Sequence, residues 1–283
     1  MPKVALVTDS STYLPKERMD PYVIRVVPLV VIWSGKELHD GVDIQPTDFY
    51  TRLQTAREMP TTSQPSPLAV KEVFDKLLAE GYDILGIFIS SKFSGTFASA
   101  EQAQAMLPSA NIEIIDSLIG SMGAGWPILV TAQAAARGAS LAECKAIAQK
   151  ALENVGILLM VDTLEFLHRG GRIGGAQRFL GDALSLKPIL EVVDGIFVGL
   201  ERVRTRQKAL KRLAELLEDR IAGRTPVRLA VLHANAPELA NQMLQEAIQR
   251  VHPVDTIMAD VSPAVGAHLG PGTVGFAFMA GIE

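Results

Sequence analysis

The segment Ile84–Ala100 constrains the fold of this chain more than any other. Its first six residues are apolar and rich in β-branched side chains, a pattern typical of a buried strand. A polar run, Ser90–Thr96, follows, and apolar residues then recur at helical spacing from Phe97. A helix N-terminus offers unpaired N–H groups and partial positive charge, and the hydroxyls of Ser94 and Thr96 add donors. The segment therefore predicts an anion site, although Ser94 or Thr96 could instead act only as a helix cap.

Strand and helix patterns alternate through about the first 150 residues, which is the signature of a largely parallel sheet with helices on both faces. From Lys187 the pattern changes, because a hairpin with an Asp194-Gly195 turn precedes helices and strands in mixed order. We therefore predict an α/β protein of two domains. The first, residues 1–155, is a three-layer α/β/α domain with a largely parallel sheet. The second, residues 156–283, is an α+β domain with a mixed or antiparallel sheet.

Several local patterns bear on this fold. Val23–Trp33 is one apolar run with Pro28 inside it, which favours a bent or edge strand. Trp126–Ala136 is apolar on nearly every side, so we expect a helix that is buried on more than one face and helps to line an apolar slot. Ser66 and Ser140 each precede a helical pattern and predict N-caps, the second as part of a capping box.

The composition is aliphatic: apolar residues make up 48% of the 283 residues, aromatic residues 6% and charged residues 20%. Such a composition fits a doubly covered parallel sheet, and it also fits a lipid-holding cavity. The formal net charge is −4 and no long basic run occurs, which argues against a general nucleic-acid binder. One cysteine, Cys144, excludes a disulfide framework, and the five histidines lack the spacing of common metal sites.

Motifs for the usual cofactors are missing as well, including the glycine-rich dinucleotide and P-loop patterns, so we expect no metal and no cofactor. The first residues lead directly into a strand pattern without the features of a signal peptide. No apolar run is long enough to span a bilayer. We expect a cytoplasmic protein without an integral membrane segment.

Two further stretches carry more polar residues or glycines than a simple connection requires. Pro60–Pro67 places Thr-Thr-Ser-Gln ahead of the Ser66 cap, and taken alone it would be a surface loop. Thr163–Gly175 combines four glycines with Arg169 and Arg172. Such arginines can present donors to a carboxylate or phosphate, although two solvated arginines on a loop are an equal alternative.

Seven short fragments, taken together, resemble one family. They are Thr8-Asp-Ser-Ser11, Pro60-Thr-Thr-Ser-Gln-Pro-Ser66, Ser90-Ser-Lys-Phe-Ser-Gly-Thr96 with Ser99-Ala100, Arg169-Gly-Gly-Arg-Ile173, Leu186-Lys-Pro-Ile-Leu190, Val203-Arg-Thr205 with Lys208-Ala209, and Gly266-Ala-His-Leu-Gly-Pro-Gly272. In identity and order they resemble the DegV family of bacterial fatty-acid-binding proteins, and they cover essentially the whole chain.

The resemblance implies two α/β domains of the EDD fold with one long-chain fatty acid, such as palmitate, stearate or oleate, buried between them. It also implies delivery of that acid to the catalytic subunit of a fatty acid kinase, which makes the acyl phosphate. The family's carboxylate-binding hydroxyls fall on Thr62 and Ser94, and its head-group histidine falls on His268. The fatty-acid-binding motifs also include Ser63, Gly95 and Thr96.

Arg172 and Arg204 match family positions that are linked to the kinase encounter. Arg172 lies in a glycine-flanked loop, and Arg204 lies between two other arginines just ahead of a basic helical pattern. We therefore expect both on a partner-docking surface outside the inner lipid site.

The chain also departs from the family's pattern. Tyr13 stands where Asp often follows T-D-S-S, Phe93 stands where Leu is common, and Gly174 replaces a frequent Ser. Of the aromatic residues near the S-G-T motif, Phe93 and Phe97 could both alter the acyl tunnel. The chain-length preference therefore stays open.

The residues alone agree with this chemistry, because a fatty acid needs a few convergent donors at one end and a long apolar slot at the other. The alternative is an acyl or phosphoryl ester hydrolase with Ser94 as nucleophile and His268 as its base. A carrier needs donors around an intact carboxylate, whereas a hydrolase needs an activated serine and access for water. Both remain open from sequence, and we favour the carrier, which is not an enzyme.

Overall fold

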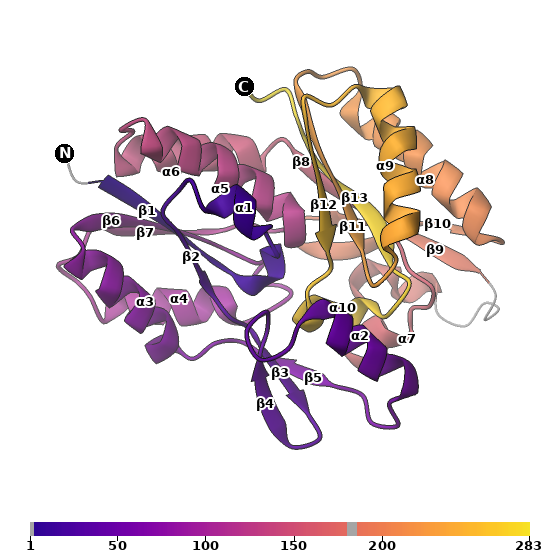
Figure 1. Cartoon of the computed structure of the whole chain (residues 1–283), viewed down its shortest axis with the longest axis horizontal. Helices are drawn as coiled ribbons and strands as arrows, with labels where there is room; N and C mark the ends of the chain where they lie inside the picture. Colours follow the sequence, from indigo (N-terminus) through magenta and orange to yellow (C-terminus); the bar gives the residue numbers. More distant parts are fainter. Residues whose placement is uncertain (1–2, 180–185) are drawn as a thin grey trace.

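Figure 1 shows the computed structural model of the chain, which describes residues 3–179 and 186–283. The first half is built on a four-stranded sheet in the order β2-β1-β6-β7, and each neighbouring pair is parallel. Its strands are β1 (Lys3–Asp9), β2 (Ile24–Val27), β6 (Tyr82–Phe88) and β7 (Ile112–Asp116). One face carries α3 (Pro67–Ala79) and α4 (Thr96–Ala105), and the other carries α5 (Ser121–Ala136) and α6 (Leu141–Leu152). The predicted three-layer arrangement is confirmed.

The second half is built on a six-stranded mixed sheet in the order β10-β9-β8-β13-β11-β12. The pair β11–β12 is parallel and the other neighbours are antiparallel. The strands are β8 (Val155–Met160), β9 (Lys187–Val193), β10 (Ile196–Val203), β11 (Val227–His233), β12 (Asp255–Asp260) and β13 (Val274–Ala280). The predicted hairpin is confirmed as β9–β10, with φ of 47° at Asp194 and 80° at Gly195, the left-handed pair that a type I′ turn needs.

Two long helices cover one face of this second sheet, α8 (Arg206–Ile221) and α9 (Pro237–Val251). Its other face packs against α5, which therefore lies between the two sheets. This position explains why α5 is apolar on nearly every side, as the sequence predicted. The helix begins at Ser121, five residues earlier than predicted from the run at Trp126. The added turn contains Gly123, where a Cβ would come within 2.8 Å of the Ile157 side chain on β8, so the glycine favours close packing of helix and sheet.

A third, three-stranded sheet has the order β4-β3-β5, with β3 (Val30–Trp33), β4 (Lys36–His39) and β5 (Thr61–Ser63) paired antiparallel. The prediction of one strand over Val23–Trp33 is therefore wrong. The run divides at Pro28 into β2 and β3, which belong to different sheets, because proline cannot continue a ladder of backbone hydrogen bonds. The expected surface loop at Pro60–Pro67 likewise contains the short strand β5.

The remaining elements are short. They are the 3₁₀ helices η1 (Ser10–Thr12) and η2 (Gly174–Phe179) and the α-helices α1 (Lys16–Met19), α2 (Pro46–Thr55), α7 (Glu165–Arg169) and α10 (Pro263–Leu269). The sequence reading missed α10, although the signals were present: the Ser262 side chain accepts from the Val265 N–H, and Pro263 occupies the first turn. The predicted caps at Ser66 and Ser140 are confirmed, the latter as a complete capping box.

The largest core cluster extends through both halves of the chain, since it joins residues of β1 and β6 with residues of β8, β11 and β13 through α5. The division near residue 155 stays a prediction, because α5 packs against both sheets. Within the described ranges, no helix is both long enough and apolar enough to cross a membrane.

Candidate functional site

A pocket lies where the two halves of the chain meet, outside the carboxyl ends of β6 and β7. The order of the first sheet reverses between β1 and β6, and open α/β sheets bind ligands in the crevice at such a switch point. The space between protein atoms at the pocket is ≈ 840 Å³, part of which is open to solvent. The polar run that follows β6 therefore lies at the edge where such sheets bind ligands, which agrees with the anion site predicted from Ile84–Ala100.

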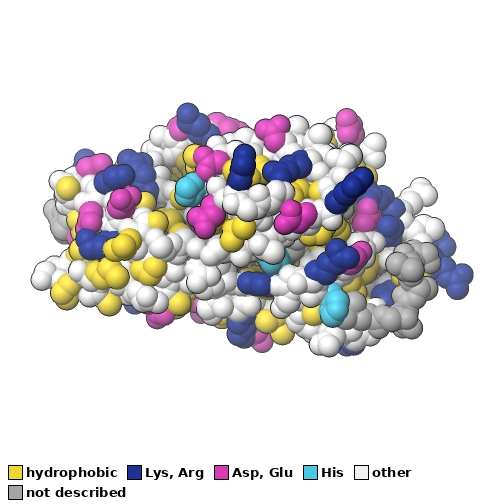
Figure 2. Space-filling model, turned by 90° about the horizontal axis from the view of Figure 1, so that it is seen from below, with side chains coloured by type: hydrophobic (Ala, Val, Ile, Leu, Met, Phe, Trp, Pro, Cys, Tyr) yellow, Lys and Arg dark blue, Asp and Glu magenta, His cyan; other side chains and the backbone are white. Residues whose placement is uncertain are grey.

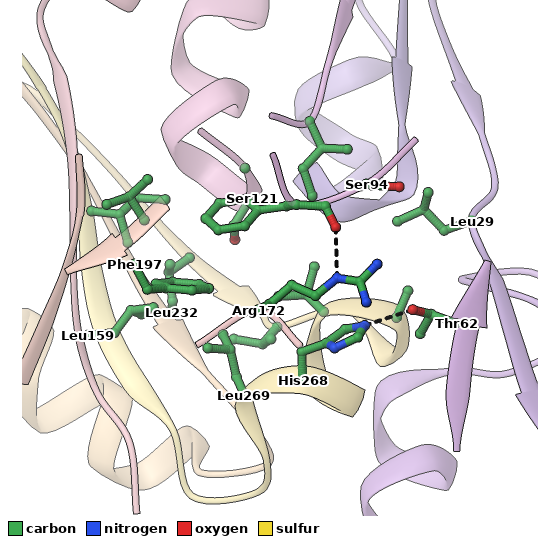
Figure 3. A pocket seen from close by; sticks show the side chains of 18 of the residues that line it. Leu29, Thr62, Ser94, Ser121, Leu159, Arg172, Phe197, Leu232, His268 and Leu269 are labelled. Atoms are coloured by element: carbon green, nitrogen blue, oxygen red, sulfur yellow. Dashed lines mark hydrogen bonds between the residues drawn. The ribbon is translucent and has the colours of Figure 1, made fainter. Parts of the chain in front are cut away.

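The pocket is polar at one end and apolar over the rest of its wall. Figure 3 shows Thr62, Ser94, His268 and Arg172 gathered on one side and Phe197, Leu159 and Leu232 on the other. The apolar wall comes from β8, β9, β10, β11 and α10, through Ile157, Leu159, Val192, Phe197, Leu232, Val265 and Leu269. The expectation that Trp126–Ala136 lines the slot is wrong: no residue of that run lines the pocket, because this part of α5 fills the space between the sheets, and α5 contributes only Ser121 among the described lining residues.

Thr62 and His268 form the central polar pair. Thr62 lies on β5 and His268 on α10, and their Oγ1 and Nε2 atoms are 2.7 Å apart. The ring packs against Gly170, where a Cβ would come within 2.1 Å of Nδ1. Burial, and then the charge of Arg172, lower the pKa of His268 to about 4, so the imidazole is neutral near pH 7.

The tautomer of His268 follows from its surroundings. The Nδ1 atom is buried and has no hydrogen-bond partner among the described residues. A buried N–H without an acceptor is rarer than an unpaired acceptor, so we assign the proton to Nε2. The Nε2–H then donates to the Thr62 oxygen, which leaves the Thr62 hydroxyl proton free to donate into the pocket.

Ser94 precedes α4 at the opposite edge of this polar end. Its Oγ lies 2.8 Å from Thr96 Oγ1 and accepts weakly from the Thr96 N–H at 3.3 Å. The N-cap residue is Gly95, without a side-chain cap bond, so Ser94 does not cap α4 in the usual way. Gly95 lets the loop approach Gln64, whose side chain would meet a Cβ at 2.9 Å. Thr96 is buried and supports Ser94 without lining the pocket itself.

Sequence reasoning missed two polar residues of the lining, Gln64 and Ser121. Gln64 belongs to a fragment that carried the family resemblance, whereas Ser121 follows β7 and lies in none of the fragments. Ser63 does line the pocket, as expected, and is exposed. Phe93 lines the pocket too and packs on Phe197 with ring centroids 4.7 Å apart. Phe97 packs into a different core cluster, against the helices and strands of the first sheet, so its expected effect on the tunnel finds no support.

Arg172 does not stand apart from the pocket, as we expected of a docking residue, but lines it. The chain turns back after α7 at Gly171, with φ of 69°, and this turn directs the guanidinium across to the first half of the chain. Its Nε donates to the Phe93 carbonyl at 3.0 Å and its Nη1 to the Gly170 carbonyl at 2.6 Å. Arg204, in contrast, is exposed at the end of β10 and outside the pocket. A role in partner docking stays a prediction for both.

The geometry gives little support to the hydrolase alternative. A nucleophilic serine needs a base within hydrogen-bonding distance, and the base needs a third group that orients it. Ser94 Oγ bonds to Thr96, and His268 bonds to Thr62. In the described part of the chain, no carboxylate faces His268 Nδ1. The described residues also contain no group of three or more His, Cys, Asp or Glu side chains that could hold a metal ion.

Comparison with known proteins assigns the chain to a family. The family model described as "Uncharacterised protein, DegV family" matches residues 3–281. The chain belongs to the DegV family. A DegV domain-containing protein of Listeria innocua is 36% identical over 274 residues, which are 96% of this chain and 97% of the relative.

Solved DegV structures share the whole fold. The DegV family protein of Thermus thermophilus, described by its fatty-acid binding, has a TM-score of 0.93 and 33% identity and covers 98% of this chain and 99% of its own. DegV of Bacillus subtilis, described as a fatty-acid-binding protein, has a TM-score of 0.89 and 33% identity over 99% of this chain and 100% of its own. These DegV neighbours bind fatty acids, and both match the two-domain α/β fold from end to end.

Proposed function

We propose that this DegV protein binds one long-chain fatty acid such as palmitate, stearate or oleate, with its carboxylate at Thr62, Ser94 and His268. The observation that carries the proposal is the division of the pocket into one polar end and a long apolar wall. A fatty acid has the same division, and the fatty-acid-binding DegV relatives support the assignment. Arg172 adds the positive charge that favours a carboxylate over a neutral head group.

The energetics favour a ligand held without a metal or a covalent bond. Each buried methylene contributes about 0.8 kcal/mol, so a sixteen-carbon tail contributes roughly 10 kcal/mol before the costs of binding. The hydroxyl donors therefore fix the orientation of the ligand more than its affinity. The pocket lies between the two halves of the chain. The free energy gained by burying the acyl chain there also predicts that the fatty acid is released slowly.

The proposal is tested by comparing oleate with methyl oleate and oleyl alcohol on delipidated protein. All three share the tail, but only oleate has a charged head group that accepts strong hydrogen bonds from hydroxyls and from Arg172. We expect oleate to bind at least about tenfold more tightly than either analogue in an equilibrium titration. Equal affinity for the three would show that the polar end does not hold the carboxylate.

We propose further that the bound acid is presented to the catalytic subunit of a fatty acid kinase. Ser63 and Gln64 line the polar end of the pocket and are exposed, so this end lies near the surface where a second protein can reach it. Figure 2 shows Lys and Arg side chains gathered toward the end of the molecule that holds β9, β10 and α8. Exposed Arg204 lies in this region, and such charges steer an acidic partner surface or the phosphates of its nucleotide.

Arg204→Ala should therefore lower acyl-phosphate formation with the cognate kinase and ATP by about tenfold or more, while oleate affinity stays unchanged. The difference in acyl-phosphate formation between wild type and Arg204→Ala should shrink as salt is added to both reactions, because steering charges are screened. Lys150→Ala, an exposed cation on α6 and outside this region, is the matched control and should behave like wild type. Unchanged phosphorylation of Arg204→Ala, or a matching loss of oleate affinity, would contradict the docking role.

A further inference from the structure

A second pocket lies on the other side of the first sheet's switch point. Its volume is ≈ 1160 Å³, part of which is open to solvent, and it lies where the carboxyl ends of β1 and β2 face the carboxyl end of β12. Each of these strands belongs to a parallel pair, β1–β2 in the first sheet and β11–β12 in the second. Ligands of open α/β sheets bind beyond the carboxyl ends of parallel strands, and here two such edges converge.

Asp40 is the most unusual residue of this second pocket. It is 2% exposed and lines the pocket. Ser10 Oγ donates to its Oδ2 at 2.7 Å, and the Leu29 N–H donates to Ser10 Oγ at 3.0 Å, so one oxygen of the carboxyl is fixed. The other, Oδ1, has no hydrogen-bond partner among the described residues. Ser262 and the Ala264 amide lie on the α10 side and lower the pKa of the carboxyl, but neither makes a hydrogen bond to Oδ1.

Acidic side chains outnumber basic ones on the pocket wall, which carries Asp40, Asp260 and Glu17 against Lys16, and His233 Nδ1 lies 3.3 Å from Asp260 Oδ1. Burial raises the pKa of Asp40 to about 7, and burial also raises the pKa of Asp260, which lines the same pocket. Burial and the charges of these two carboxylates raise the pKa of Tyr13 as well. Glu17 and Lys16 lie at the rim and are both exposed, so they cancel each other. A bound cation would supply Asp40 with a countercharge that no described residue provides.

The rest of the wall is apolar and aromatic. Val26, Val42 and Met258 line the pocket although each is more than a third exposed, and Val42 is 68% exposed. Tyr13 presents its ring beside them and is held by a hydrogen bond from its hydroxyl to Gln45 Oε1 at 2.8 Å. Its backbone has φ of 42°, which is uncommon for a residue other than glycine or asparagine. An ammonium group can bind the carboxylates and the aromatic face together.

We propose that this second pocket binds a small organic cation, a protonated amine carried on an apolar body, with Asp40 and Asp260 as its anionic partners. The metal alternative is weaker, because the described residues here offer no group of three ligating side chains. The apolar wall also favours an organic body over a bare ion. The inference stands apart from fatty-acid binding, since the two pockets share no lining residue.

Calorimetric titration with phenethylammonium tests the proposal, with 2-phenylethanol as the neutral analogue and 3-phenylpropionate as the anionic one. The amine should bind at least about tenfold more tightly than the alcohol, because a hydrogen bond to a buried carboxylate is charge-assisted, and the acid should not bind. Asp40→Asn should remove the preference for the amine, while Ser94→Ala in the first pocket should leave it intact. Equal affinity for amine and alcohol, or an unchanged preference in Asp40→Asn, would overturn the proposal.

A pair of surface variants gives the same answer if Asp40→Asn fails to fold. Val42→Lys and Val42→Glu differ only in the sign of a charge at the exposed rim of the pocket. Val42→Lys should weaken amine binding severalfold relative to Val42→Glu, and the difference should decrease at high salt. Identical affinities of the two variants at low salt would place the amine elsewhere and overturn the site.

The pH dependence supplies a further readout. The titratable groups that interact with the Asp40 carboxyl are Asp9 of β1, Tyr13 and Tyr50 of α2. Asp260 of β12 interacts with the same two tyrosines and with His233 of β11, whose Nδ1 lies 3.3 Å from Asp260 Oδ1. The amine stays protonated below about pH 9, and it binds the ionised form of Asp40. Its affinity should therefore rise about fivefold from pH 6 to pH 7 and about twofold more by pH 8, where Asp40 is almost fully ionised. An affinity that is flat between pH 5 and pH 8 contradicts the role of Asp40.

Discussion

Val192→Asp should abolish detectable oleate binding. Val192 lines the apolar wall of the first pocket from β9, so an aspartate there would face the acyl chain. When the ligand enters, the new carboxylate must either lose its water or take up a proton, and either costs free energy. We expect a loss of at least about 3 kcal/mol, which is more than a hundredfold in affinity. Equilibrium titration of delipidated protein with oleate measures it.

The neighbouring residue provides a matched control. Val193 is 41% exposed and does not line the pocket, because successive side chains of a strand point to opposite faces. Val193→Asp carries the same charge and the same loss of β propensity, yet it should bind oleate like wild type. If both variants lose binding equally, the effect comes from disruption of the β9–β10 hairpin, and Val192 does not contact the ligand.

The second large effect is expected from removing both head-group hydroxyls, in the double variant Thr62→Val with Ser94→Ala. Each hydrogen bond to a charged group contributes about 1–3 kcal/mol, and the two act on one carboxylate, so the total should be about 2–5 kcal/mol. The change should appear as a loss of oleate affinity with little change in the affinity for oleyl alcohol. Titration of the single and double variants with both ligands separates the two effects.

The double variant also has a structural consequence. Thr62→Val leaves the buried Nε2–H of His268 without an acceptor, so the free energy of unfolding should fall by about 1–3 kcal/mol. Thr61→Val on the same strand and Ser91→Ala in the same loop as Ser94 are exposed controls that should change neither binding nor stability. A double variant with wild-type oleate affinity would remove the hydroxyls from the site.

The main architecture could be predicted from the sequence because its signals are local. The β-branched runs, the Asp194-Gly195 turn and the Ser140 cap each specify an element through nearby residues, and all three were confirmed. The start of α5 could not be found in this way. Gly123 and Gly125 favour a break when seen alone, and only the packed structure shows what they accommodate: Ile157 of β8 approaches Gly123, and Leu14 approaches Gly125.

In the candidate site, too, local patterns predict some features and contacts between distant segments determine the others. Thr62, Ser94 and His268 are 206 residues apart at most, and the structure brings them to one end of one pocket. The local strand-to-helix pattern of Ile84–Ala100 already indicated Ser94, whereas Thr62 and His268 were identified as carboxylate-binding residues through the family resemblance. The sequence placed Arg172 outside the pocket because a glycine-flanked loop gives no sign of where the following side chain points. The apolar wall comes from five strands and helices whose inward faces are known only once the sheets are packed.

If the first pocket holds a free fatty acid, protein purified from bacteria should contain it. Protein purified from bacteria is extracted with organic solvent, and the extract is quantified by mass spectrometry against the protein concentration. We predict close to one free long-chain fatty acid per chain, rather than esters or phospholipids, and its loss in Val192→Asp. Well-folded wild-type protein that is consistently empty, and that also fails to take up added oleate or palmitate, would contradict the account.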